Sequence, residues 1–333
     1  MCGFLVVGSS ELELQVFNDA LNQAAYRGPD HQHVSINNGI TWGFNRLSIM
    51  DLSSKGNQPF VYKDCVLVCN GEVYNYHSLK AMLETDYTFK SGSDCEVLIP
   101  LYHKYGIEIL CKFLDAEFAM VIYDAKKDKI LAARDPMGIR PMFYGYHKED
   151  GKICFASEAK GLFPLCQEIM PFPPGHYYED GKFICYNDLS NPKTINNDDL
   201  ETIAINLRLK LEKAVEKRLQ SDAPIGYLLS GGLDSSLVCA IAARLNDQPI
   251  KTFAIGMDTD PIDLKYAKQV ADYLGTDHTE VIMTKEDLLE NLRDVIFHLE
   301  TYDITTIRAS MAMYLLCKYI HEKTDLKVIL TGE

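Results

Sequence analysis

The second half of the chain alternates between short strand-like and longer helix-like segments, and this alternation limits the fold more than any other feature. In order, the strand-like segments are PIGYLLS, KTFAIG, HTEVIM and LKVILT, and those between them are DSSLVCAIAARL, DLKYAKQVADYLG, EDLLENLRDVIFHLE and IRASMAMYLLCKYIHEK. Strands that alternate with helices predict a parallel, doubly wound α/β sheet, which binds ligands beyond the carboxyl ends of its strands. The sequence stops at ILTGE, directly after a strand, so we expect this domain to continue in a longer protein.

The first half has a different pattern. Up to about residue 186, short apolar runs are broken by Gly, Asn, Asp and Pro, as in TWGFNRLSIM, VYKDCVLVCNG, EFAMVIYDAKKDKILAARD and KICFAS. Two stretches, ELELQVFNDALNQAA and CEVLIPLYHKYGIEILCKF, have apolar residues at helical spacing. Strands in runs with few helices predict an α+β layered domain. We therefore place one domain at residues 2–187, a linker at 188–199 within NDLSNPKTINNDD, and a second domain at 200–333.

A helix is expected to follow the linker. Asp198 and Glu201 have the spacing of a capping box, which would start the helix. Apolar residues recur on one face of it, which predicts a buried stripe made of Ile203, Leu207, Leu211, Val215 and Leu219.

Composition excludes several classes of function. The chain has 333 residues, 47% of them hydrophobic and 24% charged, which is typical of a globular protein with more than one domain. A formal net charge of −14 argues against binding to nucleic acid or to a membrane surface, since both require basic patches. No apolar run is long enough to span a membrane and residues 1–8 lack the features of a signal peptide, so we expect a cytoplasmic protein. The 10 cysteines are scattered without a C-x-x-C pair, which predicts reduced structural thiols.

The strongest local signal is YLLSGGLDSS at residues 227–236. A buried strand is expected to end at Leu229, before a tight turn and a helix that begins at Asp234 or Ser235. Glycines let the backbone approach a ligand, and the N-terminus of the helix presents free N–H groups to an anion. The hydroxyls of Ser230 and Ser235 add donors, and Asp234 could hold Mg²⁺ against phosphates. The G-K-[ST] ending of a Walker A loop is absent, so a phosphate loop of another type is predicted.

This stretch resembles the pyrophosphate loop of the ATP-pyrophosphatase superfamily, whose members cleave ATP to AMP and pyrophosphate while they adenylate a substrate. The resemblance implies backbone contacts to adenine at Leu228 and Ile255. It implies an ATP and pyrophosphate site made of Leu228, Ser230, Gly231, Gly232, Asp234, Ser235, Ile255, Thr331 and Gly332. Thr331, Gly332 and Glu333 match the start of a Ser-Gly-Glu-Gly segment that contacts the acyl-adenylate in that superfamily.

An adenylating domain needs a nucleophile for the activated carboxyl, and the first domain contains groups that could release ammonia from an amide. Removal of Met1 would leave a thiol and a free α-amino group on Cys2, a nucleophile with its own base. Arg46 could hold an α-carboxylate bidentately, and Asp94 could accept from an α-ammonium group. Asn70 could form an oxyanion hole together with the N–H of Gly71. Each feature has an ordinary alternative, such as an edge-strand cysteine, a solvated arginine or an Asn-Gly hairpin turn.

Together these residues resemble a known family. Cys2, Arg46, Asn70, Gly71, Glu72 and Asp94 occur in the order found in the glutaminase domain of class II, N-terminal-nucleophile amidotransferases. The segments ARDPMGIRPMFYG and FASEAKGL are similar to later signatures of that domain. Because SGGLDSS follows it, the chain is identified as a member of the glutamine-hydrolysing asparagine synthetase family, to which FAIGM, DLKYAKQVADYLGTDH and ETYDITTIRAS are also similar. The resemblance implies a four-layer αββα sandwich, followed by an α/β parallel-sheet domain that binds adenine nucleotide and is truncated at its C-terminus.

The resemblance also implies a reaction. Cys2 would hydrolyse glutamine, with Asn70 and Gly71 as the oxyanion hole. The glutamine site would comprise Arg46, Leu47, Ser48, Ile49, Met50, Asn70, Gly71, Glu72 and Asp94. The second domain would use ATP and Mg²⁺, the metal held by Asp234, to form β-aspartyl-AMP, which ammonia converts to asparagine. The residues around the adenylate and aspartate would be Thr305, Arg308 and Glu333.

The expected partners are the small molecules glutamine, aspartate and ATP, without nucleic acid or membrane, and a homodimer is left open. Three alternatives also remain open: a different carboxylate acceptor, a truncated chain with glutaminase activity only, and a sensor with vestigial sites. Intact Cys2, Arg46, Asn70, Asp94 and Asp234 argue against the sensor. Asp263 could either cap the helix that follows it or contact a ligand. Tyr26 stands where many relatives have His, and Gly3 where some have Ser.

Overall fold

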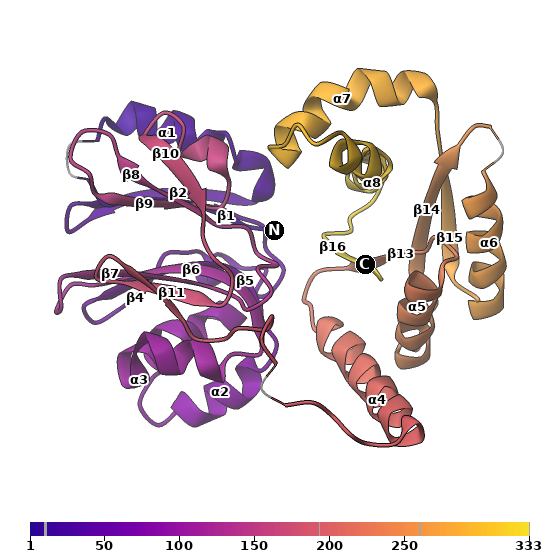
Figure 1. Ribbon diagram of the computed structural model, residues 1–333, viewed down its shortest axis with the longest axis horizontal. Helices are drawn as coiled ribbons and strands as arrows, with labels where there is room; N and C mark the ends of the chain where they lie inside the picture. Colours follow the sequence, from indigo (N-terminus) through magenta and orange to yellow (C-terminus); the bar gives the residue numbers. More distant parts are fainter. Residues whose placement is uncertain (10–11, 193, 260, 333) are drawn as a thin grey trace. The chain divides into compact units, whose positions relative to one another are not determined.

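The computed structural model describes residues 1–9, 12–192, 194–259 and 261–332. The chain divides into two compact units, Met1–Asn196 and Asn197–Glu333. Each unit has its own sheets and its own hydrophobic core (Figure 1). Among the described helices, none combines the length and the apolar character needed to cross a membrane.

Two antiparallel sheets form the centre of the first unit. Their strand orders are β10-β8-β9-β1-β3-β2 and β12-β11-β7-β6-β5-β4. The first sheet contains β1 (Gly3–Val7), β2 (His31–Asn37), β3 (Ile40–Arg46), β8 (Phe143–His147), β9 (Ile153–Ala156) and β10 (Cys166–Pro171). The second contains β4 (Phe60–Tyr62), β5 (Cys65–Val73), β6 (Ala116–Asp124), β7 (Lys129–Arg134), β11 (His176–Glu179) and β12 (Lys182–Cys185). Helix α1 (Leu14–Asn22) lies outside the first sheet, and α2 (Tyr76–Leu83) and α3 (Leu98–Phe113) lie outside the second (Figure 1).

Alternation of side chains along the strands builds the layers of this unit. On β1, Phe4 and Val6 face the core between the two sheets, whereas Leu5 and Val7 face α1. Strand β5 alternates in the same way between the inner core and the core beneath α2 and α3. Both faces of the sheets are therefore buried at β1 and along most of β5, which is why these two strands read as nearly continuous apolar runs. The αββα sandwich implied by the sequence is confirmed.

Three short 3-10 helices position side chains at one end of these sheets: η1 (Ala25–Arg27), η2 (Ser54–Gly56) and η3 (Asp94–Val97). A fourth, η4 (Ala159–Gly161), follows β9. The two helices expected from the sequence are present as α1 and α3, but α3 is kinked at Gly106, whose φ is 80°. Helix α2 was not expected.

The second unit contains a parallel sheet of strand order β15-β14-β13-β16. Its strands are β13 (Ile225–Leu228), β14 (Lys251–Met257), β15 (Asp277–Met283) and β16 (Val328–Leu330). Helices α5 (Leu233–Leu245) and α6 (Ile262–Leu274) pack on one face, and α8 (Ile304–Lys323), which follows α7 (Lys285–Leu299), packs on the other. The chain adds β14 and β15 on one side of β13 and then returns to place β16 on the other side. The predicted doubly wound sheet is confirmed, with its switch point at β13 and β16.

The helix after the linker, α4 (Leu200–Arg218), differs from expectation in two ways. Its N-cap is Asp199, whose carboxylate accepts the Thr202 N–H at 2.9 Å, so the capping box predicted at Asp198 and Glu201 is wrong. Only Val215 is buried, against α5, and Leu207 is 63% exposed. The predicted stripe therefore contacts the core of this unit only near its C-terminal end.

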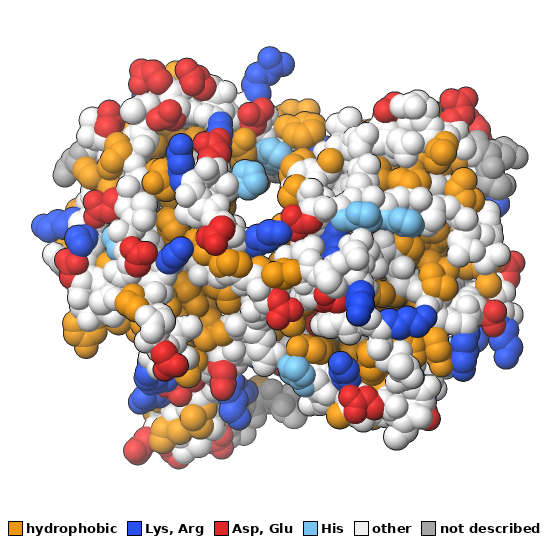
Figure 2. Space-filling model, turned by 180° about the vertical axis from the view of Figure 1, so that it is seen from behind, with side chains coloured by type: hydrophobic (Ala, Val, Ile, Leu, Met, Phe, Trp, Pro, Cys, Tyr) orange, Lys and Arg blue, Asp and Glu red, His pale blue; other side chains and the backbone are white. Residues whose placement is uncertain are grey.

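All 10 cysteines are free thiols, and 7 of them are buried, which confirms the expectation of reduced structural residues. Acidic side chains are spread beside basic ones over the face of the molecule seen in Figure 2.

Candidate functional site

Two peptide segments hold Cys2 in place. The Leu47 N–H donates to the Cys2 Sγ at 3.4 Å, and the thiol in turn approaches the Leu47 carbonyl oxygen at 3.5 Å. On the other side, the Arg27 Nε donates to the carbonyl oxygen of Cys2 at 2.9 Å. Cys2 packs against the core between the two sheets. Its thiol and its peptide group are therefore both fixed before any substrate is present.

Arg27 is itself fixed by a buried ionic cluster. Its Nη1 pairs with the Glu158 Oε1 at 2.9 Å, and the Tyr26 hydroxyl donates to the Glu158 Oε2 at 2.6 Å. The Lys160 ammonium lies 2.9 Å from that same oxygen. Burial alone would raise the pKa of Glu158, but the Tyr26 hydroxyl and the Arg27 and Lys160 cations hold it below its ordinary value. Tyr26 thus supplies a hydrogen bond to the group that orients Arg27.

Burial disfavours charge at both ionisable groups of the N-terminus. It lowers the pKa of the Met1 amino group to about 5, although the Met1 side chain itself is exposed. Burial also raises the pKa of the Cys2 thiol, while the neighbouring amino terminus and the hydrogen bond to Leu47 oppose the rise. At neutral pH the Met1 amino group is therefore uncharged.

Strand β5 places an amide donor on the side of the inner core that Cys2 also borders. Asn70 follows Val66 and Val68 at even spacing, so its side chain points into the space between the two sheets. Asn70 is only 1% exposed, and its Nδ2 has no hydrogen-bond partner among the described residues. A buried donor without an acceptor is costly, so this amide is prepared for an acceptor that the protein itself does not supply.

Two carboxylates lie next to this donor, Asp94 buried and Glu72 half-buried. Glu72 is on the same face of β5 as Asn70, and Asp94 begins η3. Burial raises the pKa of Asp94 to about 6, against an opposing hydrogen bond from the Val73 N–H at 2.6 Å. Burial and the nearby Asp94 charge raise the pKa of Glu72 well above its ordinary value. A cation placed between them would relieve both effects, so the pair is suited to a ligand ammonium group.

A further arginine moderates this acidic pair. Arg140 is 8% exposed, and its Nη2 lies 3.6 Å from a carboxylate oxygen of Glu117. Its charge opposes the rise in the pKa of both Glu72 and Asp94. The cluster therefore combines acidic groups that attract an ammonium with a cation that keeps them partly ionised.

Arg46 has a different role in this structure from the one predicted. Its Nη1 donates to the Ser53 carbonyl at 2.6 Å and to the Asn57 Oδ1 at 2.7 Å. Its Nη2 donates to the carbonyls of Met50, at 3.3 Å, and Asp51. The guanidinium thus holds loop 50–57, and a substrate carboxylate would have to compete for these donors. Bidentate binding of an α-carboxylate by Arg46 stays a prediction.

The first unit brings most of the predicted glutamine-site residues to one place. Leu47 contacts Cys2 directly, and the neighbouring Ser48 N–H donates to Asp30 at 2.7 Å. Ile49 and Met50 continue this loop after β3, and Asn70, Gly71 and Glu72 end β5 beside Asp94.

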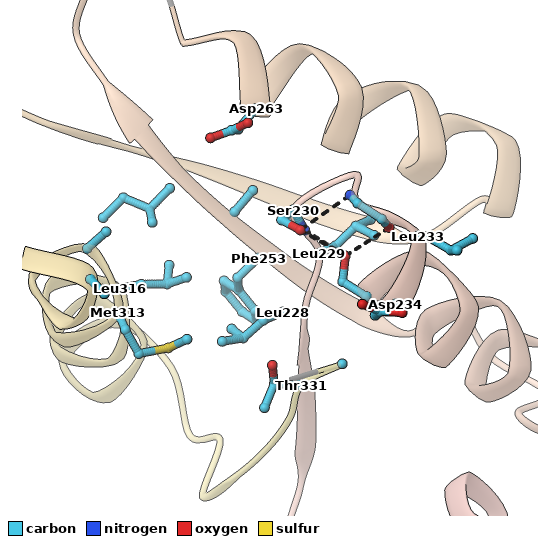
Figure 3. A pocket seen from close by; sticks show the side chains of 17 residues that line it. Leu228, Leu229, Ser230, Leu233, Asp234, Phe253, Asp263, Met313, Leu316 and Thr331 are labelled. Carbon is cyan, nitrogen blue, oxygen red and sulfur yellow. Dashed lines mark hydrogen bonds between the residues drawn. The ribbon is translucent and has the colours of Figure 1, made fainter. Parts of the chain in front are cut away.

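The second unit contains a pocket of about 450 Å³ at the switch point of its sheet (Figure 3). Eight of the predicted nucleotide-site residues line it: Leu228, Ser230, Gly232, Asp234, Ser235, Ile255, Thr331 and Gly332. Phe253 and Leu228 form the base, between α8 on one side and the Ser230 loop on the other (Figure 3). Asp263 also points into this pocket, and the cap of α6 is Pro261, so the ligand-contact alternative for Asp263 is favoured.

The loop at the mouth of this pocket is organised by its own hydroxyls. The Ser230 and Ser235 side chains lie 2.9 Å apart, and Ser230 Oγ accepts the Gly232 N–H at 3.3 Å. Gly231 does not line the pocket but makes the turn possible. Its φ is +79°, and a Cβ at this position would lie 2.6 Å from the backbone nitrogen of Ala267. Only glycine fits both the angle and the space.

Helix α8 supplies the apolar wall, which sequence reasoning missed. Ala309, Ala312, Met313 and Leu316 face the pocket at helical spacing. Thr305 and Arg308 do not line it; they are exposed and extend the same face one turn toward the N-terminus. Glu333 lies outside the described residues.

Asp234 fits the predicted metal role in part. The described residues hold no cluster of three or more His, Cys, Asp or Glu side chains placed to bind a metal. Mg²⁺ is usually bound by one or two carboxylates together with substrate phosphates. The Asp234 carboxylate on the pocket wall can supply such a contact once a nucleotide brings its phosphates.

Several residues of the first site were also missed by sequence reasoning: Arg27, Gln58, Glu117 and Arg140. Their contacts join segments distant in sequence, and no local pattern marks them. Arg140 is an exception, because it lies within ARDPMGIRPMFYG, a segment similar to a signature of the glutaminase domain.

A comparison with known protein families agrees with this geometry. Residues 1–174 match the family described as glutamine amidotransferase domain, and the chain belongs to this family. Residues 206–333 match the family described as asparagine synthase. The resemblance drawn from the sequence is thereby confirmed.

Three curated relatives define the likeness more closely. The chain is 40% identical to a probable glutamine-hydrolysing asparagine synthetase of Schizosaccharomyces pombe, over 100% of this chain and 64% of that protein. It is 40% identical to the glutamine-hydrolysing asparagine synthetase of Zea mays, over 100% of this chain and 58% of that protein. It is 41% identical to asparagine synthetase B of Escherichia coli, over 92% of this chain and 58% of that protein. The chain thus spans about three fifths of the length of these relatives.

Proposed function

We propose that the first unit hydrolyses glutamine, with residues 2–187 as its glutaminase domain. The observation that carries this proposal is the buried, unpartnered Nδ2 of Asn70, aimed into the inter-sheet space that Cys2 borders. The Leu47 backbone already holds the Cys2 thiol in place there. An amide-hydrolysing site needs a fixed nucleophile and a donor for the oxyanion, and these residues supply both.

Removal of Met1 makes the α-amino group of Cys2 available as a base. It takes the thiol proton as the sulfur attacks the carbon of the glutamine side-chain amide. The Asn70 Nδ2 and the Gly71 N–H receive the charge that develops on the oxygen. The amine returns its proton to the leaving nitrogen, ammonia departs, and water hydrolyses the glutamyl thioester to glutamate. Glu72 and Asp94 hold the α-ammonium group of the substrate, and we retain Arg46 as the candidate for its α-carboxylate.

We propose that the second unit, residues 200–333 after a linker at 188–199, activates a carboxylate with ATP. The pocket at the switch point offers an apolar wall for adenine and a hydroxyl-rich loop for phosphates. Mg²⁺ would neutralise phosphate charge there, and Asp234 would hold it. The aspartate β-carboxylate attacks the α-phosphorus, and the Ser230 loop binds the pyrophosphate that leaves. The ammonia released by glutamine then displaces AMP to give asparagine.

Thr305 and Arg308 are retained as candidates for the adenylate, because they continue the α8 face that lines the pocket. Glutamine, aspartate and ATP are the partners this chemistry requires. The net charge of −14 argues against nucleic acid. Free thiols throughout the chain support a reducing compartment such as the cytoplasm. A homodimer is proposed as the assembly and is tested by sedimentation.

The glutaminase proposal is tested with Cys2→Ser. Glutamate formation from glutamine should fall to background in this variant. Cys185→Ser removes an equally free but exposed thiol and should leave the rate unchanged. Mass spectrometry of the active protein should show that Met1 has been removed. Full activity in protein that retains Met1 would refute the N-terminal nucleophile.

The synthetase proposal is tested by exchange of labelled pyrophosphate into ATP, with aspartate present or absent. Exchange should require aspartate and should be lost in Asp234→Asn. Asp247→Asn, an exposed acid after α5, serves as the control and should retain exchange. If exchange requires a different carboxylate, that carboxylate is the substrate in place of aspartate. If no exchange occurs while glutaminase activity is intact, this chain catalyses only the first reaction.

A further inference from the structure

The outer edge of β5 is only partly covered by a neighbouring strand. On one side β5 pairs with β6 along its whole length, from Cys65 to Val73. On the other side β4 pairs only with Cys65, Val66 and Leu67. Yet Asn70 and Gly71, the proposed oxyanion donors, lie beyond the point where β4 ends. Some other group must hold that edge in register.

Beyond the end of β4, the side chain of Gln58 pairs with this edge of β5. Continuing the antiparallel register two residues beyond the Phe60–Leu67 pair puts Gln58 opposite Cys69. The Gln58 Oε1 accepts the Cys69 N–H at 2.6 Å, and the Gln58 Nε2 donates to the Cys69 carbonyl at 3.0 Å. Its side-chain amide thus makes the two bonds that a strand backbone would make. Gln58 is 6% exposed, so water does not compete for them.

The same edge leads directly to the proposed oxyanion hole. Successive odd-numbered residues of β5 direct their backbone groups outward. The Val73 N–H donates to the Asp94 Oδ2 at 2.6 Å, and the Cys95 thiol approaches the Gly71 carbonyl at 3.5 Å. The Gly71 N–H faces this edge between the anchors at Cys69 and Val73. Its direction therefore depends on how firmly the two anchors fix the strand.

We propose that Gln58 is a positioning residue of the glutaminase site, which fixes the Cys69 peptide and thereby aims the Asn70 side chain and the Gly71 N–H at the oxyanion. This inference rests on the proposed function of the first unit. Gln58 does not touch substrate. Loss of its two bonds frees the edge of β5 next to the donors, and displacement of a reacting geometry by about 1 Å can cost about 100-fold in rate.

Two substitutions separate positioning from simple filling of space. Gln58→Leu removes both bonds while it keeps a similar volume, and kcat for glutamine should fall at least about 10-fold with a smaller change in KM. Gln58→Glu keeps the acceptor but loses the donor when it is ionised. When protonated, its hydroxyl can donate to the Cys69 carbonyl and restore both bonds. The ratio of the Gln58→Glu rate to the wild-type rate should therefore rise as the pH falls.

Asn75→Asp is the matched control. Asn75 also uses its side-chain amide for two backbone bonds, to the Phe113 carbonyl at 2.8 Å and from the Asp115 N–H at 3.1 Å. These bonds do not involve β5. Its rate relative to wild type should stay near one at every pH. For Gln58→Leu, the ratio should be low and independent of pH.

A second readout checks that the nucleophile is intact. Iodoacetamide alkylates a thiol by displacement of iodide and forms no oxyanion. Its rate at Cys2, followed by mass spectrometry, should be nearly equal in wild type, Gln58→Leu and Gln58→Glu. Slow hydrolysis with normal alkylation supports positioning of the oxyanion donors. Hydrolysis at the wild-type rate in Gln58→Leu would overturn this inference but not the proposed function. The same holds if Gln58→Leu loses both hydrolysis and alkylation and the rate of Gln58→Glu does not recover as the pH falls. Wild-type protein that does not hydrolyse glutamine would overturn the proposed function, and this inference with it.

Discussion

Replacement of Asp94 by asparagine is expected to stabilise the first unit while it abolishes glutamine binding. Asp94 is only 4% exposed and lies beside Glu72. Burial raises the pKa of Asp94 from 3.8 to about 6. In the interval between these values the folded protein holds a proton that the unfolded chain has released. The stability that this protonation contributes is fully present below pH 3.8 and is lost as the pH rises through about 6.

The size of the effect follows from the same values. Each unit between two pKa values is worth about 1.4 kcal/mol. The interval from 3.8 to about 6 therefore makes the ionised carboxylate unfavourable by about 3 kcal/mol at pH 7. Asparagine carries no charge and can still accept the Val73 N–H, which lies 2.6 Å from the present carboxylate. Its amide hydrogens enter a site built around an acceptor, at a cost of about 1 kcal/mol. The expected net gain is about 2 kcal/mol at pH 7, with no gain at pH 4.

The assay is calorimetric unfolding of the full chain between pH 4 and pH 7. A gain of about 2 kcal/mol should raise the affected transition by about 4 to 8 °C at pH 7. Asp64→Asn, a substitution at an exposed position on the loop between β4 and β5, should leave this transition unmoved. Glutamine hydrolysis by Asp94→Asn should be lost at the same time. A variant no more stable than wild type at pH 7, or equally stabilised at both pH values, would refute the assignment of a costly buried charge.

Three further predictions concern the two sites. Asn70→Ala should lower kcat for glutamine about 100- to 1,000-fold in steady-state kinetics, because it removes an oxyanion donor. Asn75→Ala should leave kcat unchanged, and equal losses in both variants would contradict the oxyanion role. KM for glutamine should rise as the pH falls through about 6, because protonated Asp94 no longer attracts an ammonium group, and a constant KM from pH 5 to pH 8 would argue against this contact. Gly231→Ala should weaken ATP binding at least about 10-fold, because the new Cβ would lie 2.6 Å from a backbone nitrogen. Gly275→Ala has a similar φ of +67° with open space around it, so calorimetry should find ATP binding retained there.

The second unit could be predicted closely from sequence. Its strands and helices have distinct residue types and lengths, so KTFAIG and HTEVIM were placed correctly as β14 and β15. The candidate phosphate loop is contiguous, and one short motif therefore named 7 of the 17 residues that line the pocket. The apolar wall of α8 was not predicted, because Met313 and Leu316 look like ordinary core residues until the helix is docked on the sheet.

The candidate catalytic residues of the first unit could be named from the sequence, but the contacts that hold them could not. Cys2, Asn70 and Asp94 carry polar or ionisable groups and lie in short segments whose pattern can be recognised in the sequence. Gln58 bonds to the Cys69 peptide, and Glu158 pairs with the Arg27 side chain. Such contacts join separate segments of the chain, and the periodicity of apolar residues does not predict them. Helix α2 was missed because it spans only Tyr76–Leu83 and follows directly from a strand.

The parallel pairing of β13 with β16 has a consequence for how the nucleotide pocket forms. Ile225 pairs with Val328, so these strands meet only after the chain has passed through every other strand and helix from β13 onward. Contacts so distant in sequence close a long loop and tend to form late in folding. Thr331 and Gly332 reach the pocket through this pairing. Filling of the pocket therefore requires that β16 has already paired with β13, and a ligand bound there would stabilise that pairing.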